Sequence, residues 1–334
     1  MAFSRRTFSK ALLSNLPIAT GACSLIKPSL LTAFASLDML TSFGATPLSG
    51  TVAHGALAVP SGGPTLGLNT WSLRALKHHQ AIPAILRVMK ETGLRNCQLL
   101  FSHAEPEEFD PDFSSIGRAD GKAPAPQERD EKKRKSDART AWRLSVPMTY
   151  FESLRLQFEQ RGLTIRAYAT PLGSSAEEID RVLLMAKTMG AVAVNTRLPE
   201  AQTDVVAAAA VRHGLFVGIQ VADVRVLALQ LRASPQLRAD PDLGDLTKAG
   251  LSALEFIKEH LDSISSIDLK DAVPGGGSVP FGTGDAHMQQ ALEFLVRARS
   301  RVELYVDCDY PGTGSSTDEV KRCVGYARGV MNES

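Results

Sequence analysis

The chain has 334 residues, of which 44% are hydrophobic and 22% are charged, and its formal net charge is +1. This length allows one large hydrophobic core, and the near-neutral charge predicts no strong attraction to nucleic acid. Beyond the N-terminal region, no apolar run reaches the roughly 18 residues that a transmembrane helix needs, so no membrane span is predicted. The four cysteines have no CxxC spacing, which argues against a zinc ribbon or a thioredoxin-type site.

The N-terminus has the pattern of an export signal. Residues 4–10 read SRRTFSK, and an apolar stretch follows them. A short basic head before an apolar segment is typical of a secretory signal, and this one matches the twin-arginine consensus SRRxFxK. We expect 1–35 to be a twin-arginine signal peptide, ending at an A-x-A pattern, and 36–63 to be a linker. The predicted partner is then the twin-arginine export machinery, and the predicted location is periplasmic or extracellular. A disordered basic tail is the alternative.

From residue 64 onward, short apolar runs alternate with helical patterns. This alternation is typical of βα units around a parallel sheet. The predicted strands cover residues 65–71, 96–102, 163–170, 191–196, 215–221, 237–243, 263–271 and 301–309. Helical patterns cover residues 80–93, 175–190, 201–214, 251–261, 286–299 and 316–331. The sequence therefore predicts an α/β protein with a single domain at 64–331, folded as a (β/α)8 TIM barrel.

Residues 103–147 interrupt this pattern in the second βα connection. They run from an acidic start through a stretch with glycine and proline into the charged run ERDEKKRKSDAR. Acidic and basic residues are mixed in that run, which favours a solvated loop or partial helix over a basic docking patch. Because βα loops lie at the C-terminal ends of barrel strands, we expect this long loop insertion near the barrel mouth.

The period-two alternation of the strands separates inward from outward side chains. Polar and aromatic residues gather on the inward faces near the C-terminal strand ends, namely Asn69, Trp71, Arg166, Tyr168, Gln220, Asp268, Lys270, Asp307 and Asp309. Active sites of (β/α)8 barrels lie at that end. An unpaired buried polar atom costs roughly 1–3 kcal/mol, so this polar layer favours a functional site over a purely structural interior.

Three motifs in succession point to a family. DLGD at 242–245, IDLKD at 267–271 and PFGTGD at 280–285 resemble the Asp-x-Gly-His, His-x-Lys-Asp and Pro-x-Gly-x-Gly motifs of the xylose isomerase-like sugar phosphate isomerase/epimerase barrels. The likeness covers about residues 64–331. It implies an enzyme that acts on a sugar or an oxidised sugar by proton abstraction next to a carbonyl.

The same resemblance implies a metal site at the barrel mouth. The family holds a divalent metal with a Glu, an Asp, a His and a Glu, which follow or lie in the fourth, sixth, seventh and eighth strands. This sequence has Asn195 where the fourth-strand Glu is expected, and the other three positions match Asp242, Asp268 and Asp307. Oxygen ligands favour Mg²⁺ or Mn²⁺ over zinc. We therefore expect a divalent cation, Mg²⁺ or Mn²⁺, held by these three aspartates.

The inward residues and the resemblance together give roles to individual side chains. Asp307 is the predicted proton-transferring base, with Lys270 as a second catalytic residue. The predicted substrate-binding residues are His103, Trp71, Tyr168, Arg166 and Asp245. Alternatives remain open: His103 could be solvated in its loop, and the two aromatic residues could fill the upper layer of the barrel. Lys270 and Arg166 could also neutralise the three aspartates with no metal bound.

Two functions follow from these features. The first is an isomerase, epimerase or lyase with a small-molecule sugar substrate and a metal that polarises the carbonyl. The alternative is a catalytically silent barrel that binds a carbohydrate or a partner protein and has lost the family metal site. The missing fourth-strand Glu favours the silent barrel, whereas Asp242, Lys270 and the inward polar layer favour the enzyme.

Overall fold

The computed structural model describes residues 62–76, 78–109 and 126–333. These belong to one compact unit, Ala58–Ser334. The predicted signal peptide and residues 36–61 of the predicted linker lie outside the described residues, so both stay predictions. Within the described residues, no helix combines the length and apolar character that crossing a membrane requires.

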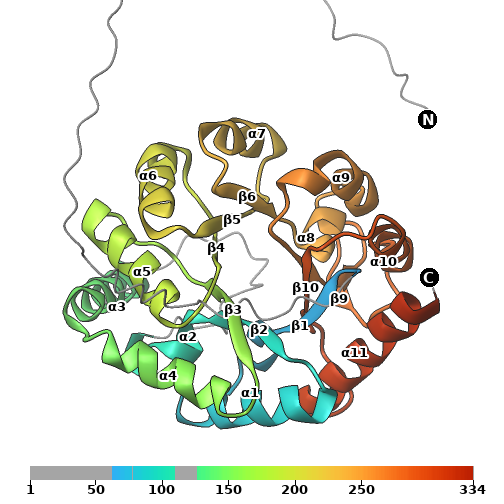
Figure 1. Cartoon of the computed structure of the whole chain (residues 1–334), viewed down its shortest axis with the longest axis horizontal. Coiled ribbons are helices and arrows are strands. Elements are labelled where there is room, and N and C mark those ends of the chain that lie inside the picture. The colour runs from blue at the N-terminus through green and yellow to red at the C-terminus, as the bar shows by residue number, and fades with distance from the viewer. Residues whose placement is uncertain (1–61, 77, 110–125, 334) are drawn as a thin grey trace, which may run out of the picture. The chain divides into compact units, whose positions relative to one another are not determined.

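Parallel strands form the centre of the molecule, in an eight-stranded sheet with the order β6-β5-β4-β3-β2-β1-β10-β7 (Figure 1). The strands are β1 (Thr65–Asn69), β2 (Asn96–Leu100), β3 (Thr164–Ala169), β4 (Ala193–Thr196), β5 (Phe216–Gln220), β6 (Leu237–Asp240), β7 (Ser266–Leu269) and β10 (Glu303–Val306). A two-stranded hairpin, β8 (Asp271–Ala272) and β9 (Ser278–Val279), follows β7.

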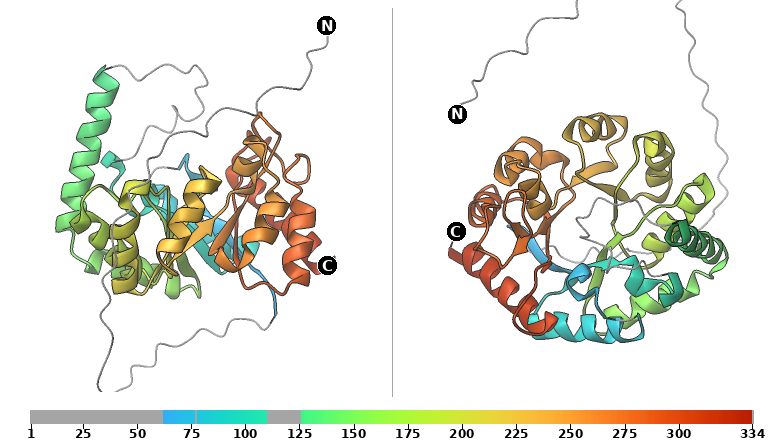
Figure 2. Two further views of the ribbon diagram at one scale, coloured as in Figure 1. Left: turned by 90° about the horizontal axis from the view of Figure 1, so that it is seen from above. Right: turned by 180° about the vertical axis from the view of Figure 1, so that it is seen from behind.

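Helices surround this sheet, as the two further views in Figure 2 also show. They are α1 (His78–Thr92), α2 (Phe101–Ala104), α3 (Pro126–Ser145), α4 (Thr149–Glu159), α5 (Ala176–Thr188), α6 (Thr203–His213), α7 (Val224–Ala233), α8 (Leu243–Lys248), α9 (Ala253–His260), α10 (Met288–Arg297) and α11 (Ser316–Glu333). Short 3-10 turns are η1 (Thr70–Leu73), η2 (Glu107–Phe109), η4 (Glu200–Gln202) and η5 (Leu261–Ser263).

The predicted (β/α)8 barrel is confirmed. Each of the eight predicted strands is present, although several are shorter than the apolar runs that marked them. The structure adds α2, α4, α7 and α8, for which no helix was predicted. It also shows that the charged run of the 103–147 insertion forms α3, a helix of 20 residues.

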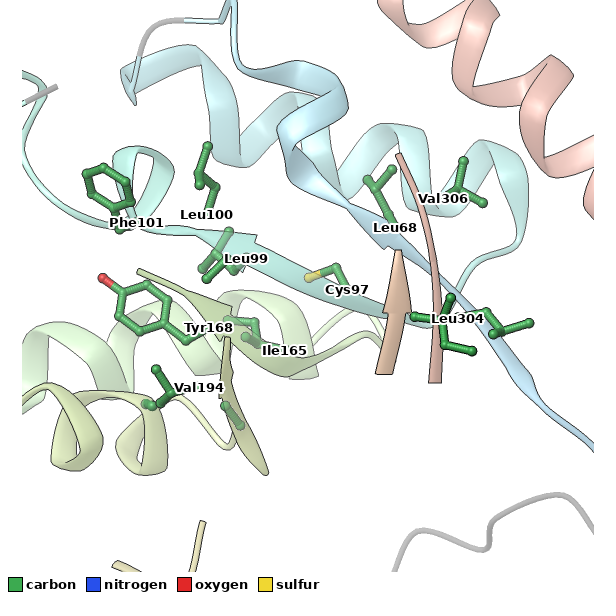
Figure 3. Packing of buried hydrophobic residues seen from close by; sticks show 14 of the residues in the cluster. Leu68, Cys97, Leu99, Leu100, Phe101, Ile165, Tyr168, Val194, Leu304 and Val306 are labelled. Carbon is green, nitrogen blue, oxygen red and sulfur yellow. The ribbon is translucent and has the colours of Figure 1, made fainter. Parts of the chain in front are cut away.

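The main core lies between the strands and the helices. Leu68, Val194, Leu304 and Val306 lie in this core with none of their surface exposed (Figure 3). Burying one such side chain contributes about 1.5–3 kcal/mol. The faces of β1 and β10 that were predicted to point outward are therefore the faces that pack against the helices.

A β-bulge changes the direction of side chains in β3. The register with β2 passes from Ile165 to Ala167 and leaves Arg166 as an extra residue. One extra residue moves every later side chain of a strand to the opposite face. Tyr168 therefore pairs with Leu99 and lies in the outer core, fully buried, so its predicted inward orientation is wrong (Figure 3).

Arg166 lies at the end of the barrel opposite the predicted mouth. It forms an ion pair of 3.1 Å with Glu303, the first residue of β10. Thr65 and Asn96, the first residues of β1 and β2, also donate hydrogen bonds to Glu303. The structure therefore contradicts the placement of Arg166 as a substrate-binding residue at the C-terminal strand ends.

A buried ion-pair network joins the insertion to the barrel. Arg143, near the end of α3, is completely buried and donates to one oxygen of Glu105 from two nitrogens, at 2.9 and 2.7 Å. It also lies 3.2 Å from Glu178 of α5. The hydroxyl of Tyr168 donates to the same Glu105 oxygen at 2.6 Å. The last turns of α3 are thus held against the barrel, while the charged first turns are exposed.

The sheet closes into a barrel through a short seam between β6 and β7. Two isolated parallel bridges connect these strands. The Ser265 N–H donates to the Ala239 carbonyl and the Asp268 N–H donates to the Pro241 carbonyl, each at 2.9 Å. The seam lies directly beside the charged residues that follow β6 and β7.

Candidate active site

Lys270 occupies the centre of a charged cluster where β6, β7 and β10 end. Its ammonium nitrogen lies 2.6 Å from Asp242, 3.0 Å from Asp307 and 3.6 Å from Asp309. Burial alone would lower the pKa of Lys270, but the charges of these carboxylates raise that pKa well above its ordinary value. The structure thus brings Asp242, Lys270 and Asp307 together, and the ammonium stays protonated among them.

The DLGD motif places both Asp242 and Lys270. Asp242 caps the N-terminus of α8, where one oxygen accepts from the Asp245 N–H at 2.9 Å and the other accepts from Lys270. Aspartate is a preferred residue at this helix position. Gly244 leaves room for the lysine, because a Cβ there would lie 2.7 Å from Cγ and 2.9 Å from Cδ of Lys270. The motif therefore supplies a carboxylate for the ammonium and a gap for its aliphatic chain.

Asp307 follows β10 and has the features of a proton-transfer group. Its side chain is 3% exposed, and one oxygen lies 3.0 Å from Lys270. The other oxygen, Oδ1, has no hydrogen-bond partner within the described part of the chain. Burial raises the pKa of Asp307 to about 7, against the lowering effect of Lys270. A carboxyl with a pKa near neutrality can both take up and release a proton at physiological pH.

Asp268 has a different environment from the other aspartates. Its Oδ1 accepts hydrogen bonds from the Asn69 amide at 3.0 Å and the Gln98 amide at 3.2 Å. Burial raises the pKa of Asp268 well above its ordinary value, and the charges of Asp240 and Asp307 add to the rise. Asp268 is thus held in the polar interior of the barrel, and no direct contact joins it to Lys270.

That interior is a connected chain of polar side chains. Asn195 donates to Gln98 and, at 2.9 Å, to Ser266, and Ser266 donates to Asp240 at 2.6 Å. Burial raises the pKa of Asp240 to about 7. Asn195 stands where the family Glu was expected, and its amide takes part in this chain. The sequence did not mark Gln98, Ser266 or Asp240, because a single inward polar residue on a strand does not show its partner.

Asp309 and Arg74 complete the cluster and were not among the predicted site residues. They form an ion pair of 2.6 Å. The Arg74 guanidinium also lies 5.1 Å from the centre of the Trp71 ring. The inward position of Asp309 on the eighth predicted strand could have identified it as a site residue. Nothing in the sequence distinguished Arg74 from other arginines. Trp71 is therefore adjacent to the cluster, as the substrate-binding prediction requires.

The two remaining predicted substrate-binding residues are His103 and Asp245. His103 in α2 is buried, and its Nδ1 lies 3.1 Å from the Thr70 hydroxyl. It lines a cavity of about 370 Å³ between α1 and α4. Asp245 is half-exposed in α8 and pairs with Lys248 at 3.1 Å. His103 is thus buried in the helical layer, while Asp245 stays close to Asp242.

A divalent cation does not fit the predicted ligands in their present arrangement. Lys270 contacts one oxygen of Asp242 and one of Asp307, the second oxygen of Asp242 caps α8, and Asp268 accepts from two amides. Within the described residues, no group of three or more His, Cys, Asp or Glu side chains is arranged to hold a metal ion. The ammonium therefore stands where the resemblance implies a metal.

Comparisons with known proteins address the fold. No family model matches the sequence, and a search of curated proteins gives no match. A xylose isomerase domain protein from Alicyclobacillus acidocaldarius is 14% identical, with a TM-score of 0.53 over 81% of this chain and 98% of that one. A sugar phosphate isomerase/epimerase from Parabacteroides distasonis is 13% identical, with a TM-score of 0.53 over 82% and 96% of the two chains.

A third solved structure, an L-ribulose 3-epimerase, is 9% identical, with a TM-score of 0.56 over 81% of this chain and 95% of that one. In all three comparisons the similar region spans nearly the whole of the other protein. At these identities the likeness establishes the fold alone. The chain has the (β/α)8 fold of the xylose isomerase-like barrels.

Proposed function

We propose that this protein is a carbohydrate isomerase or epimerase that moves a proton at a carbon next to a carbonyl. Asp307 carries the proposal, since it combines burial, an unpartnered oxygen and a pKa near 7 at the C-terminal end of a barrel strand. Perturbed carboxyl groups of this kind gather at catalytic sites. The fold-level likeness to an L-ribulose 3-epimerase and to a sugar phosphate isomerase/epimerase supports a sugar as the substrate class.

The chemistry needs a base and a positive charge close together. Asp307 Oδ1 takes the proton from the carbon, and the electron pair moves onto the carbonyl oxygen to give an enediolate. Two N–H groups of Lys270 face Asp242 and Asp307, while Asp309 at 3.6 Å is beyond hydrogen-bond distance. The third N–H is therefore positioned to stabilise the enediolate oxygen. Asp307 then returns the proton to the former carbonyl carbon, and the hydroxyl proton of the neighbouring carbon passes to the enediolate oxygen, so the carbonyl group moves by one carbon.

A silent carbohydrate-binding barrel is the second candidate function. The observation in its favour is Asn195, because an amide stands where the family has a carboxylate, and Asp307 is then the only base that the resemblance supplies. With a single base, the proton must leave and return on the same carboxyl. This requirement suits an isomerase better than an epimerase.

Proton exchange with solvent separates the two functions. Purified protein is incubated in D₂O with a panel of aldoses, ketoses and sugar acids, and the C–H signals next to each carbonyl are followed by NMR. An enzyme of the proposed kind exchanges that hydrogen for deuterium in at least one sugar, even where the product resembles the substrate. Sugar binding without any exchange across the panel would instead support the silent barrel.

Export by the twin-arginine route is a separate proposal, and it rests on residues 4–10 of the sequence. Replacing Arg5 and Arg6 with lysine removes the pair that the export machinery reads. The double variant is expected to accumulate in the cytoplasm with its signal attached, as measured by cell fractionation. An undiminished amount of processed protein outside the cytoplasm would contradict this route.

A further inference from the structure

The position of Lys270 is set by the backbone as well as by charge. Its aliphatic chain passes over Gly244, where any larger residue would collide with it. Its side chain is 8% exposed, and its ammonium group faces carboxylates from two different connections, those after β6 and β10. A lysine that merely neutralised a surface charge would need no such gap and would remain solvated.

The surrounding carboxylates have few oxygens left for another cation. The second oxygen of Asp242 caps α8, and the second oxygen of Asp309 binds Arg74. Divalent cations require oxygen ligands at about 2.0–2.6 Å. Of these carboxylate oxygens, Oδ1 of Asp307 alone has no partner among the described residues, so such an ion would also have to take the Asp242 oxygen that Lys270 already contacts. The ammonium and a metal ion therefore compete for one position.

We propose that the ammonium group of Lys270 is the resident cation of this site and takes the place of the divalent metal. The part of this inference that concerns metal binding depends only on the geometry, while a role for the ammonium in polarising a carbonyl rests on the proposed function. It follows that removal of the lysine side chain converts the cluster into a metal site. Asp242, Asp307 and Asp309 would then be left as three adjacent carboxylates without their shared positive charge.

The test measures Mn²⁺ binding without any sugar. Protein dialysed against EDTA is titrated with MnCl₂ by calorimetry, and its melting temperature is recorded with and without the ion. We expect wild type to bind no Mn²⁺ at the site and to show no change in melting temperature. Lys270→Ala is expected to bind one ion and to melt roughly 5–10 °C higher when Mn²⁺ is at a hundredfold excess over its dissociation constant.

Lys248→Ala is the matched control. Lys248 also pairs with an aspartate of the DLGD motif, at 3.1 Å from Asp245, but its side chain is 28% exposed. Its removal should create no Mn²⁺ site, because among the described residues Asp245 alone pairs with its ammonium group. If Lys270→Ala does not fold, Lys270→Met replaces it, since methionine keeps an unbranched chain over Gly244 and lacks the charge.

Two results would overturn the inference. One is a wild type that binds Mn²⁺ stoichiometrically and melts at a higher temperature with it. The other is a folded Lys270 variant that binds no Mn²⁺. Neither result depends on catalysis. If the protein exchanges no sugar proton but gives the expected Mn²⁺ data, the proposed function is rejected and the inference about Lys270 stands.

Discussion

Replacing Asp307 with asparagine should lower kcat/KM for the exchanged sugar by about 10²–10⁴-fold, the usual contribution of a general base. Asparagine keeps the shape of the side chain and can still accept a hydrogen bond from Lys270. It cannot accept a proton from carbon, so the loss should fall mainly on kcat. The measurement is the rate of deuterium exchange into the sugar that wild type recognises, at several sugar concentrations.

The same variant should be more stable than wild type at pH 8. In the folded protein the pKa of Asp307 is raised to about 7, above its ordinary value of 3.8. The stability from this group is therefore greatest below pH 3.8 and is lost as the pH rises through 7. Asparagine does not ionise, so the variant does not lose this stability as the pH rises.

Asp180→Asn, at an exposed ion pair with Arg212, is the control for the exchange measurement and should leave the exchange rate unchanged. Full activity in Asp307→Asn would remove this residue from the mechanism.

Replacing Arg143 with methionine should lower the free energy of unfolding by about 3–5 kcal/mol. The arginine is completely buried, and its removal leaves Glu105 and Glu178 buried without their counter-charge. Breaking a buried ion pair from one side has a cost of about that size. Urea denaturation at pH 7 measures the change, provided that the dependence on urea concentration is the same in both proteins.

Arg212→Met provides the matched control for this prediction. The ion pair of Arg212 with Asp180 is 2.7 Å long, the same as the pair of Arg143 with Glu105, but both of its side chains are about half exposed. Exposed pairs contribute about 0–1 kcal/mol, because water already solvates the charges. Equal losses in the two variants would show that burial does not set the strength of the Arg143 network.

The barrel and the centre of its site could be predicted from sequence. Alternation of apolar and polar residues marked all eight strands, and parallel strands of a barrel end on the same side. The side chains that follow β6, β7 and β10 were therefore expected to meet, and Asp242, Lys270 and Asp307 do so. The resemblance also led to Asp242 and Asp307, but it grouped them with Asp268 as three metal ligands.

The wrong predictions for individual side chains have physical causes that the alternation of apolar and polar residues in the sequence does not reveal. The bulge at Arg166 shifts the alternation of β3 by one residue, and this turns Tyr168 into the outer core. Asp268 points inward as predicted, but amides from β1 and β2 hold it away from the charged cluster. Arg143 follows a highly charged run, and its burial depends on Glu105, a distant residue in sequence.

The seam between β6 and β7 makes one side of the barrel the easiest to open. Neighbouring strands elsewhere are joined by ladders of at least two consecutive pairs, with a bulge in the ladder between β2 and β3, whereas β6 and β7 have two isolated bridges. Local opening occurs first where few hydrogen bonds must break. Separation of these strands would move Asp242 away from Lys270 and let water reach the polar interior around Asp240. Local opening of the barrel between β6 and β7 would therefore break the ion pair of Asp242 with Lys270. A molecule bound across the seam would slow this opening and exclude water from the site.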